Sequence, residues 1–199
     1  MSESPAVRGF CPGAGIRGVD SPPTFPDAAD LILDSERSEQ PSGSKGILLL
    51  ADGTRFEGRL FGSEVIAEGE LVFTTGMSGY QESLTDPSFA GQVLTFTYPL
   101  LGNDGVHAGV SESSSVHPRG VVCREHMTSP DHRDSVGSVH DLLVAHNVPG
   151  IERIDTRALT RRVREYGTLL CVFGPAERVE EMETILEEMT TPDAEELVA

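Results

Sequence analysis

The sequence predicts an α+β domain that follows a disordered N-terminal tail. Three observations lead to this prediction. Residues 1–45 are rich in Pro, Gly, Ser and Asp, strand-like segments begin at Gly46, and most helix-like segments lie in the last third of the chain. Strands that come first and helices that follow are typical of α+β or mixed domains. We therefore divide the chain into a tail (1–45) and a domain (46–190), with a short remainder (191–199).

The tail contains "SPPTFP" and "SEQPSGSKG". Proline removes backbone donors and glycine raises the entropic cost of ordering, so neither stretch favours a ladder or a helix. Only "DAADLILDSE" (27–36) is compatible with a short helix.

Strand signals follow in order. "GILLLADGTRFEGRLFG" predicts a hairpin that turns at Asp52-Gly53. "EVIAEGELVFTT" predicts a strand over residues 71–74, and "GQVLTFTYPLL" predicts a β-branched strand that Pro99 ends. "RGVVCRE" and "GTLLCVFG" are typical of short buried strands.

The first clear helix signal is "SVGSVHDLLVAHN". Val139, Leu142, Leu143 and His146 fall on one face, and Asn147 can close the helix.

Two further helices are predicted. In "IDTRALTRRVREYG", Asp155 is a candidate N-cap, Leu159, Val163 and Tyr166 share a face, and Gly167 is a stop signal. The acidic "AERVEEMETILEEM" presents one apolar face, formed by Val179, Met182, Ile185, Leu186 and Met189.

Charge excludes one large class of partner. The formal net charge is −17, and of the 15 basic residues only Lys45 is a lysine. Nucleic-acid binding requires basic side chains that neutralise phosphates, so we expect no nucleic-acid partner. The acidity leads to a halophilic-like hypothesis, in which high ionic strength screens the self-repulsion of the carboxylates.

Cysteine usage and hydropathy indicate a cytoplasmic protein. Cys11, Cys123 and Cys171 are odd in number and widely spaced, which argues against a disulfide framework. Cys123 and Cys171 lie in apolar runs and are expected in the core. We find neither an apolar run near 18 residues nor a signal-peptide pattern, so no membrane partner is expected.

The sequence contains few patterns that are typical of metal, nucleotide or catalytic sites. Six histidines are scattered, and His126 and His132 lie in the polar stretch "EHMTSPDHRD", which favours solvated surface histidines over a metal site. Neither G-x-x-x-x-G-K-[ST] nor G-x-G-x-x-G occurs, so no nucleotide cofactor is expected in this chain. We predict no catalytic residue and no metal ligand.

Two polar clusters remain. "SESSSVHPRG" brings Ser111, Ser113, Ser114, Ser115 and His117 close in sequence, although a serine run is more often a loop than part of a Ser–His pair. Arg157, Arg161, Arg162 and Arg164 form either a solvated helix face or an ion-pairing surface for a partner.

One long segment fits no ordinary element. "TTGMSGYQESLTDPSFAGQVLTFTYPLLGN" (74–103) is rich in turns yet lies between strand signals. Together with "ADGTRFEGRLFG", "ESSSVHPRGVVCRE" and "IDTRALTRRVREYGT", it closely resembles the N-terminal domain of the small subunit of glutamine-dependent carbamoyl phosphate synthetase. The resemblance runs from about Gly46 to about Ala199.

The resemblance implies a swivelling β/β/α-type domain, which in the family precedes a class I glutamine amidotransferase domain with a Cys–His–Glu triad. It also implies a large-subunit partner that uses ATP, with magnesium, and bicarbonate to make carbamoyl phosphate for arginine and pyrimidine synthesis. Ammonia from glutamine reaches that subunit through a tunnel.

Carried onto this sequence, the family's D-P-S turn is Asp86-Pro87-Ser88, so Ser88 is the one predicted contact to L-glutamine. From the residues alone, Ser88 is equally a turn residue that bonds its own backbone. Gly76, Gly79 and Gly91 are expected at turns or close approaches. Four polar or aromatic side chains are expected to fix loop geometry and subunit contacts: Tyr80, Gln81, Tyr98 and Asn103.

The family's G-x-C-x-G nucleophile elbow does not follow the matched region. We therefore expect residues 191–199 to begin a linker to a missing amidotransferase domain, and the fragment alone to be inactive. A stand-alone module that binds the large subunit without glutaminase activity is the alternative, and a small enzyme that uses "SSSVHP" is a third.

Overall fold

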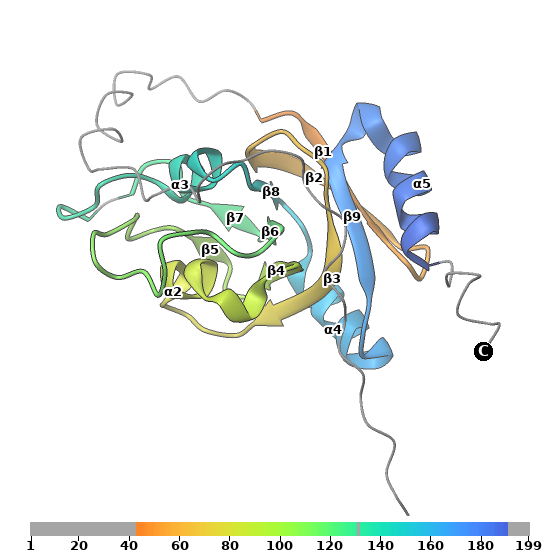
Figure 1. The fold of residues 1–199 in the computed structure, drawn as a ribbon, viewed down its shortest axis with the longest axis horizontal. Helices are drawn as coiled ribbons and strands as arrows, with labels where there is room; N and C mark the ends of the chain where they lie inside the picture. The colour runs from red at the N-terminus through yellow and green to blue at the C-terminus, as the bar shows by residue number, and fades with distance from the viewer. Residues whose placement is uncertain (1–42, 131, 191–199) are drawn as a thin grey trace, which may run out of the picture.

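The computed structural model describes residues 43–130 and 132–190. The predicted tail up to residue 42, its candidate helix 27–36 and the predicted linker 191–199 lie outside these residues. The described chain is a mixed α/β fold built on a closed barrel with the strand order β1-β2-β8-β6-β4-β3-β9 (Figure 1). The barrel strands are β1 (Lys45–Leu50), β2 (Arg55–Gly62), β3 (Ala67–Thr74), β4 (Gln92–Phe96), β6 (Gly120–Val122), β8 (Pro149–Glu152) and β9 (Leu170–Pro175).

The barrel mixes antiparallel and parallel pairs. β1 pairs with β2 and β9, and β2 with β8, all antiparallel. β3 and β4, β4 and β6, and β6 and β8 are parallel neighbours. Parallel neighbours need long crossover connections. These connections carry the helices Tyr80–Thr85 and Val139–Ala145 and the segments around them.

The β1–β2 hairpin confirms the predicted turn. Gly53 has φ +83°, and the Asp52 Oδ1 atom accepts a hydrogen bond from the backbone N–H of Thr54 at 2.8 Å. Glycine has no Cβ and therefore adopts a positive φ more readily than other residues. The turn is therefore encoded locally.

Several strand boundaries differ from the prediction. The strand expected at 71–74 begins at Ala67, and the strand expected to reach Pro99 ends at Phe96. A two-stranded parallel sheet, β5 (Leu100–Leu101) with β7 (Glu125–His126), follows outside the barrel. β8 was missed because its four residues lie next to the stronger helix signal.

Apolar side chains from all the barrel strands fill the barrel interior. Leu48 and Leu50 of β1 point inward, whereas Ile47 and Leu49 point outward. The run "ILLL" lacks alternation because both faces of β1 are covered. Helix α4 (Thr156–Tyr166) adds Leu159 to the interior cluster.

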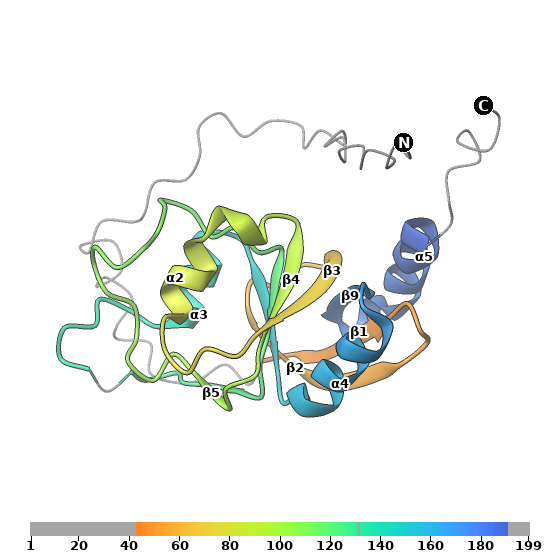
Figure 2. The same cartoon turned by 90° about the horizontal axis from the view of Figure 1, so that it is seen from below.

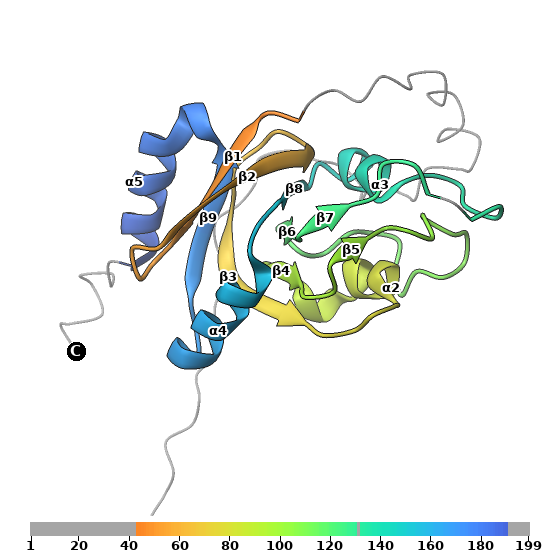
Figure 3. The same ribbon diagram turned by 180° about the vertical axis from the view of Figure 1, so that it is seen from behind.

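Two outer layers complete the fold. α2 (Tyr80–Thr85) and α3 (Val139–Ala145) lie on one side of the barrel, and α5 (Val179–Thr190) lies on the opposite side (Figures 2 and 3). Met182 of α5 is fully buried against Ile47, Leu49 and Val172. The predicted apolar face of α5 is thereby confirmed. Two 3₁₀ turns, η1 (Pro87–Phe89) and η2 (Ala176–Arg178), precede β4 and α5.

The helix ends follow the predicted chemistry. Asp155 caps α4 by accepting from the N–H of Ala158, and Gly167 ends it at φ +81°. Asn147 follows α3 with φ 54°. Of the three residues predicted to share a face of α4, Leu159 and Val163 are buried, whereas Tyr166 at the last turn is 55% exposed.

Candidate functional site

The turn 86–88 joins α2 to β4 through η1. Asp86 accepts a hydrogen bond from the backbone N–H of Ser88 through its Oδ1 atom at 2.8 Å. The N–H of Phe89 bonds the Asp86 carbonyl at 3.2 Å, and the N–H of Ala90 bonds the Pro87 carbonyl at 3.1 Å. Proline fixes its own φ and keeps the preceding residue extended, as seen at Asp86 (φ −79°, ψ 118°).

Asp86 is ionised more readily than a free aspartate. Hydrogen bonds from the Ser88 backbone and side chain lower the pKa of Asp86, and the nearby His117 adds to the effect. Hydrogen bonds to the charged form of a carboxylate stabilise that form. Ser88 is exposed, so its hydroxyl is held at the surface by a fixed backbone. Whether it contacts glutamine stays a prediction.

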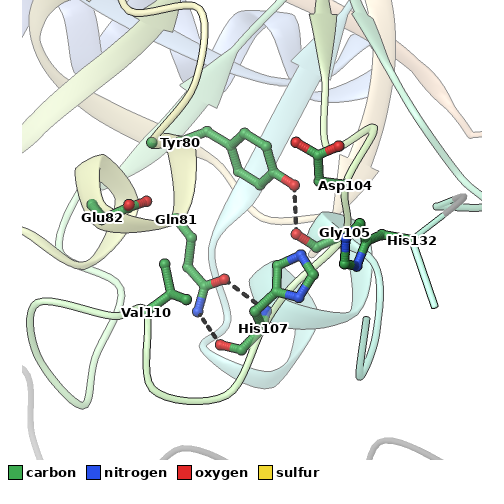
Figure 4. A pocket seen from close by; sticks show the side chains of 9 residues that line it. Tyr80, Gln81, Glu82, Asp104, Gly105, His107, Val110 and His132 are labelled. Carbon is green, nitrogen blue, oxygen red and sulfur yellow. Dashed lines mark hydrogen bonds between the residues drawn. The ribbon is translucent and has the colours of Figure 1, made fainter. Parts of the chain in front are cut away.

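Helix α2, which was not predicted, ends directly before this turn. Gln81 is only 3% exposed. Its side-chain Nε2 donates to the His107 carbonyl and its Oε1 accepts from the N–H of His107, each at 2.8 Å (Figure 4). Its Nε2 also donates to the Ser111 Oγ atom at 2.8 Å. Gln81 therefore fixes loop geometry, as expected.

A hollow of about 230 Å³ opens beside α2 (Figure 4). The Tyr80 hydroxyl donates to the Gly105 carbonyl at its wall. Burial, together with the charge of Asp104, raises the pKa of Tyr80 to about 12. The rings of His107 and His132 pack edge to face, with their centroids 4.9 Å apart. Ser88 does not line this hollow.

The serine-rich loop lies against the end of α2. Ser113 Oγ is 2.8 Å from His117 Nε2, which is the spacing of a Ser–His pair. Ser113 Oγ also lies 2.7 Å from the Thr85 carbonyl. A carbonyl can only accept, so the Ser113 proton is directed to Thr85 and His117 Nε2 is the donor to Ser113. This arrangement ties the loop to α2 and leaves His117 without the role of a base.

His126 corrects a sequence-based expectation. It was expected to be a solvated surface residue, but its side chain is 8% exposed and its Nδ1 lies 2.7 Å from Glu152 Oε2. Its ring stacks on Phe61 with centroids 4.2 Å apart. Neither partner is near in sequence, so no local signal predicts the burial. Within residues 43–130 and 132–190, no three His, Cys, Asp or Glu side chains are grouped to hold a metal ion.

The two described cysteines lie in the core, as predicted. Cys123 and Cys171 are free thiols with no measurable exposure. Burial raises the pKa of both thiols, and nearby Glu152 and Glu125 add to the rise at Cys123. A raised pKa disfavours the thiolate, which is the nucleophilic form.

The arginines of α4 divide into two kinds. Arg162 donates to Asp52 Oδ2 at 2.6 Å, and Arg164 lies over the Phe73 ring at 5.3 Å. Arg157 and Arg161 are exposed and have no ion pair within the described part of the chain. Arg162 and Arg164, two of the four arginines in the predicted cluster, thus stabilise the fold.

The remaining turn residues are placed as follows. Gly79 and Gly91 have φ +77° and +81°, whereas Gly76 has no positive φ. Asn103 donates to Asp104 Oδ1 at 3.1 Å, and Tyr98 is 40% exposed. None of the helices in the described ranges combines the length and apolarity needed to cross a membrane.

Comparison with known proteins matches the sequence of this chain to a family. The family described as "Carbamoyl-phosphate synthase small chain, CPSase domain" matches residues 48–173. This range includes the whole barrel except the ends of β1 and β9, and it includes the turn 86–88.

Curated relatives agree. The chain is 45% identical over 150 residues to the carbamoyl phosphate synthase small chain of Caldanaerobacter subterraneus subsp. tengcongensis, covering 74% of this chain and 42% of the relative. The Synechocystis small chain is 51% identical over 123 residues (62% and 32%), and that of Methanosarcina mazei 50% over 125 residues (63% and 34%). The chain thus spans less than half the length of these relatives, and it belongs to the family of carbamoyl-phosphate synthase small chains.

Proposed function

We propose that this chain is the N-terminal part of the glutamine-hydrolysing subunit of carbamoyl phosphate synthetase. The barrel, a swivelling β/β/α-type domain, packs on the large subunit, and Ser88 borders a glutamine site completed by an amidotransferase domain. The observation that carries the proposal is the turn 86–88, which holds one exposed hydroxyl on a hydrogen-bonded backbone.

The chemistry of the turn fits an amino acid ligand. A serine hydroxyl can donate to a carboxylate and accept from an ammonium group, and free glutamine carries both. One exposed hydroxyl cannot enclose an amino acid, so a neighbouring domain must supply the rest of the pocket. The burial-raised pKa values of Cys123 and Cys171 argue that neither thiol is the glutaminase nucleophile.

The partners follow from the family. On this proposal the large subunit binds ATP and magnesium and receives ammonia for carbamoyl phosphate, which feeds arginine and pyrimidine synthesis. We place the complex in the cytoplasm, since the two described cysteines are unpaired thiols. This ligase contains the chain as a non-catalytic part, and the chain alone does not hydrolyse glutamine.

The test uses an assembled enzyme. Residues 1–199 are continued by the amidotransferase segment of the Caldanaerobacter relative and mixed with that organism's large subunit. Ser88→Ala should raise the KM for glutamine several-fold, because one hydroxyl contact is worth on the order of 1 kcal/mol. Synthesis from added ammonia should not change.

Ser83→Ala is the matched control, since among the described residues Ser83 Oγ bonds the carbonyl of Gly79, the N-cap of its own helix. An unchanged glutamine KM in Ser88→Ala would remove Ser88 from the glutamine site.

The alternative is an interaction module that binds the large subunit without supplying ammonia. Arg157 and Arg161 of α4 favour it, because they are exposed, make no ion pair with the described residues, and could hold an acidic partner surface. Co-elution with the large subunit fits both proposals. Glutaminase activity after the amidotransferase segment is added back supports only the first.

A further inference from the structure

Helix α2 cannot hold the turn 86–88 in place by itself. It has six residues, and its N-cap Gly79 makes no side-chain capping bond. Isolated helices need roughly 12 residues to be even marginally stable in water. The position of Ser88, three residues beyond the end of α2, must therefore be set by contacts from elsewhere in the fold.

The hydrogen bonds that reach the end of α2 from outside the helix come from one loop, residues 107–117. Thr85 is fully buried, and its Oγ1 donates to the Gln81 carbonyl at 2.8 Å. The same oxygen accepts from the N–H of Glu112 at 2.9 Å. The Thr85 hydroxyl thus joins the last turn of α2 to the loop, and both of its hydrogen-bonding roles are used.

Two further hydrogen bonds from the loop reach the last residues of α2. Ser113 Oγ bonds the Thr85 carbonyl at 2.7 Å, and the N–H of His117 bonds the Leu84 carbonyl at 3.0 Å. His117 Nε2 lies 2.8 Å from Ser113 Oγ and closes the loop on itself. We call Thr85, Ser113 and His117 the clasp.

We propose that the clasp is a positioning device for Ser88, with Thr85, Ser113 and His117 as positioning residues rather than catalytic ones. It fixes the carbonyls of residues 84 and 85, which directly precede Asp86. Asp86 in turn holds the N–H of Ser88. The inference rests on the proposed glutamine contact of Ser88 and assigns the residues that place it.

The first test uses the chain alone and measures amide hydrogen exchange. Thr85→Val and Ser113→Ala should speed exchange at the Ser88 and Ala90 amides by about tenfold, because these bonds open locally when the clasp is lost. Thr160→Val is the matched control. Thr160 is also buried and bonds the Thr156 carbonyl one turn back at 2.6 Å, but it lies on α4.

Equal protection of Ser88 in all three variants would overturn the proposal. If Thr85→Val does not fold, Ser113→Ala decides, since Ser113 is only half-buried in a loop.

The second test uses the assembled enzyme described above. Thr85→Val and Ser113→Ala should raise the glutamine KM several-fold and leave ammonia-dependent synthesis unchanged. On a Ser88→Ala background they should add little, because residues that act through Ser88 are non-additive with it. His117→Gln keeps a donor near the Nε2 position and should retain the wild-type KM, whereas His117→Leu should not.

The outcomes separate the two proposals. If Ser88→Ala leaves the KM unchanged, the glutamine contact fails, whatever the clasp does to exchange. If Ser88→Ala raises the KM and the clasp variants do not, only the positioning role fails. The positioning role would also be rejected if the effects of Thr85→Val and Ser88→Ala on the glutamine KM were fully additive.

Discussion

Glu152 and His126 form the most enclosed contact between an acidic and a basic side chain among the described residues. Their side chains are 10% and 8% exposed, and His126 also donates its backbone N–H to Glu152 at 3.2 Å. Burial opposes the charge of Glu152, but the bond and charge of His126 outweigh it and lower the pKa of Glu152 below 4.5. The pair joins β8 to the outer strand β7.

This pair predicts a pH-dependent stability. Because the folded-state pKa of Glu152 is depressed, its contribution is present above about pH 4.5 and is lost as pH falls through the folded pKa. At pH 7, Glu152→Gln should lower the free energy of unfolding by about 2 kcal/mol. Urea denaturation at several pH values should show that the difference in free energy of unfolding between Glu152→Gln and wild type shrinks as the pH falls.

Glu68→Gln is the control at the residue scale. The Glu68 carboxylate lies 3.7 Å from the Arg119 guanidinium, and both side chains are about half exposed. Exposed pairs contribute under about 1 kcal/mol. A loss in Glu68→Gln equal to that in Glu152→Gln would show that burial is irrelevant to the effect.

The β1–β2 turn and α4 are linked through one carboxylate. The Asp52 side chain is 7% exposed and accepts from both Thr54 and Arg162. Burial opposes its ionisation, yet the hydrogen bonds from Thr54 and Arg162 lower the pKa of Asp52. The bond fixes a helix to a hairpin that lies 110 residues earlier in the sequence.

Substitutions of the neighbouring residues Arg161 and Arg162 should differ in their effect on stability. Arg162→Gln should lower the free energy of unfolding by about 1.5 kcal/mol, because it removes a hydrogen bond between charged groups. Arg161→Gln should have almost no effect, since Arg161 is exposed and unpaired in the described chain. Chemical denaturation of both variants in one buffer would test this, and equal stabilities would refute it.

At the scale of the whole molecule, the charge is strongly unbalanced. The net charge is −17, and α5 presents several glutamates on the face opposite Met182. Uncompensated negative charge destabilises a compact state through self-repulsion. Salt shortens the screening length from about 10 Å at 0.1 M to about 3 Å at 1 M.

We therefore propose that the protein is adapted to high ionic strength. Its melting temperature should rise as KCl is raised from 0.1 M to 2 M, and circular dichroism would follow the transition. A melting temperature that does not depend on salt, with a stable fold in dilute buffer, would reject the halophilic-like interpretation.

Local signals predicted local structure. The Asp52-Gly53 turn, the Asp155 cap and the apolar face of α5 were all read from neighbouring residues. Each depends on backbone preferences or a repeat of about 3.6 residues, both of which are encoded within one turn of chain. The turn 86–88 was located differently, through the resemblance to the carbamoyl phosphate synthetase small-subunit family.

The site around that turn was not predictable locally. Thr85 and Gln81 bind a loop 26 to 30 residues away, and their side chains carry no pattern that indicates a six-residue helix. His126 looked solvated because its partners Phe61 and Glu152 are distant in sequence. Tertiary packing therefore decided which polar residues were buried.

The sequence by itself determined the family, the hairpin, the helix caps and the position of the Asp86-Pro87-Ser88 turn. Only the tertiary structure decided the parallel strand order and the clasp. It also explained Gly120 and Gly150, where an added Cβ would lie 2.4 Å from the rings of Phe173 and Phe61. The physical reason is that caps and turns are satisfied by adjacent residues, whereas close approaches and shared hydroxyls exist only once distant segments have packed.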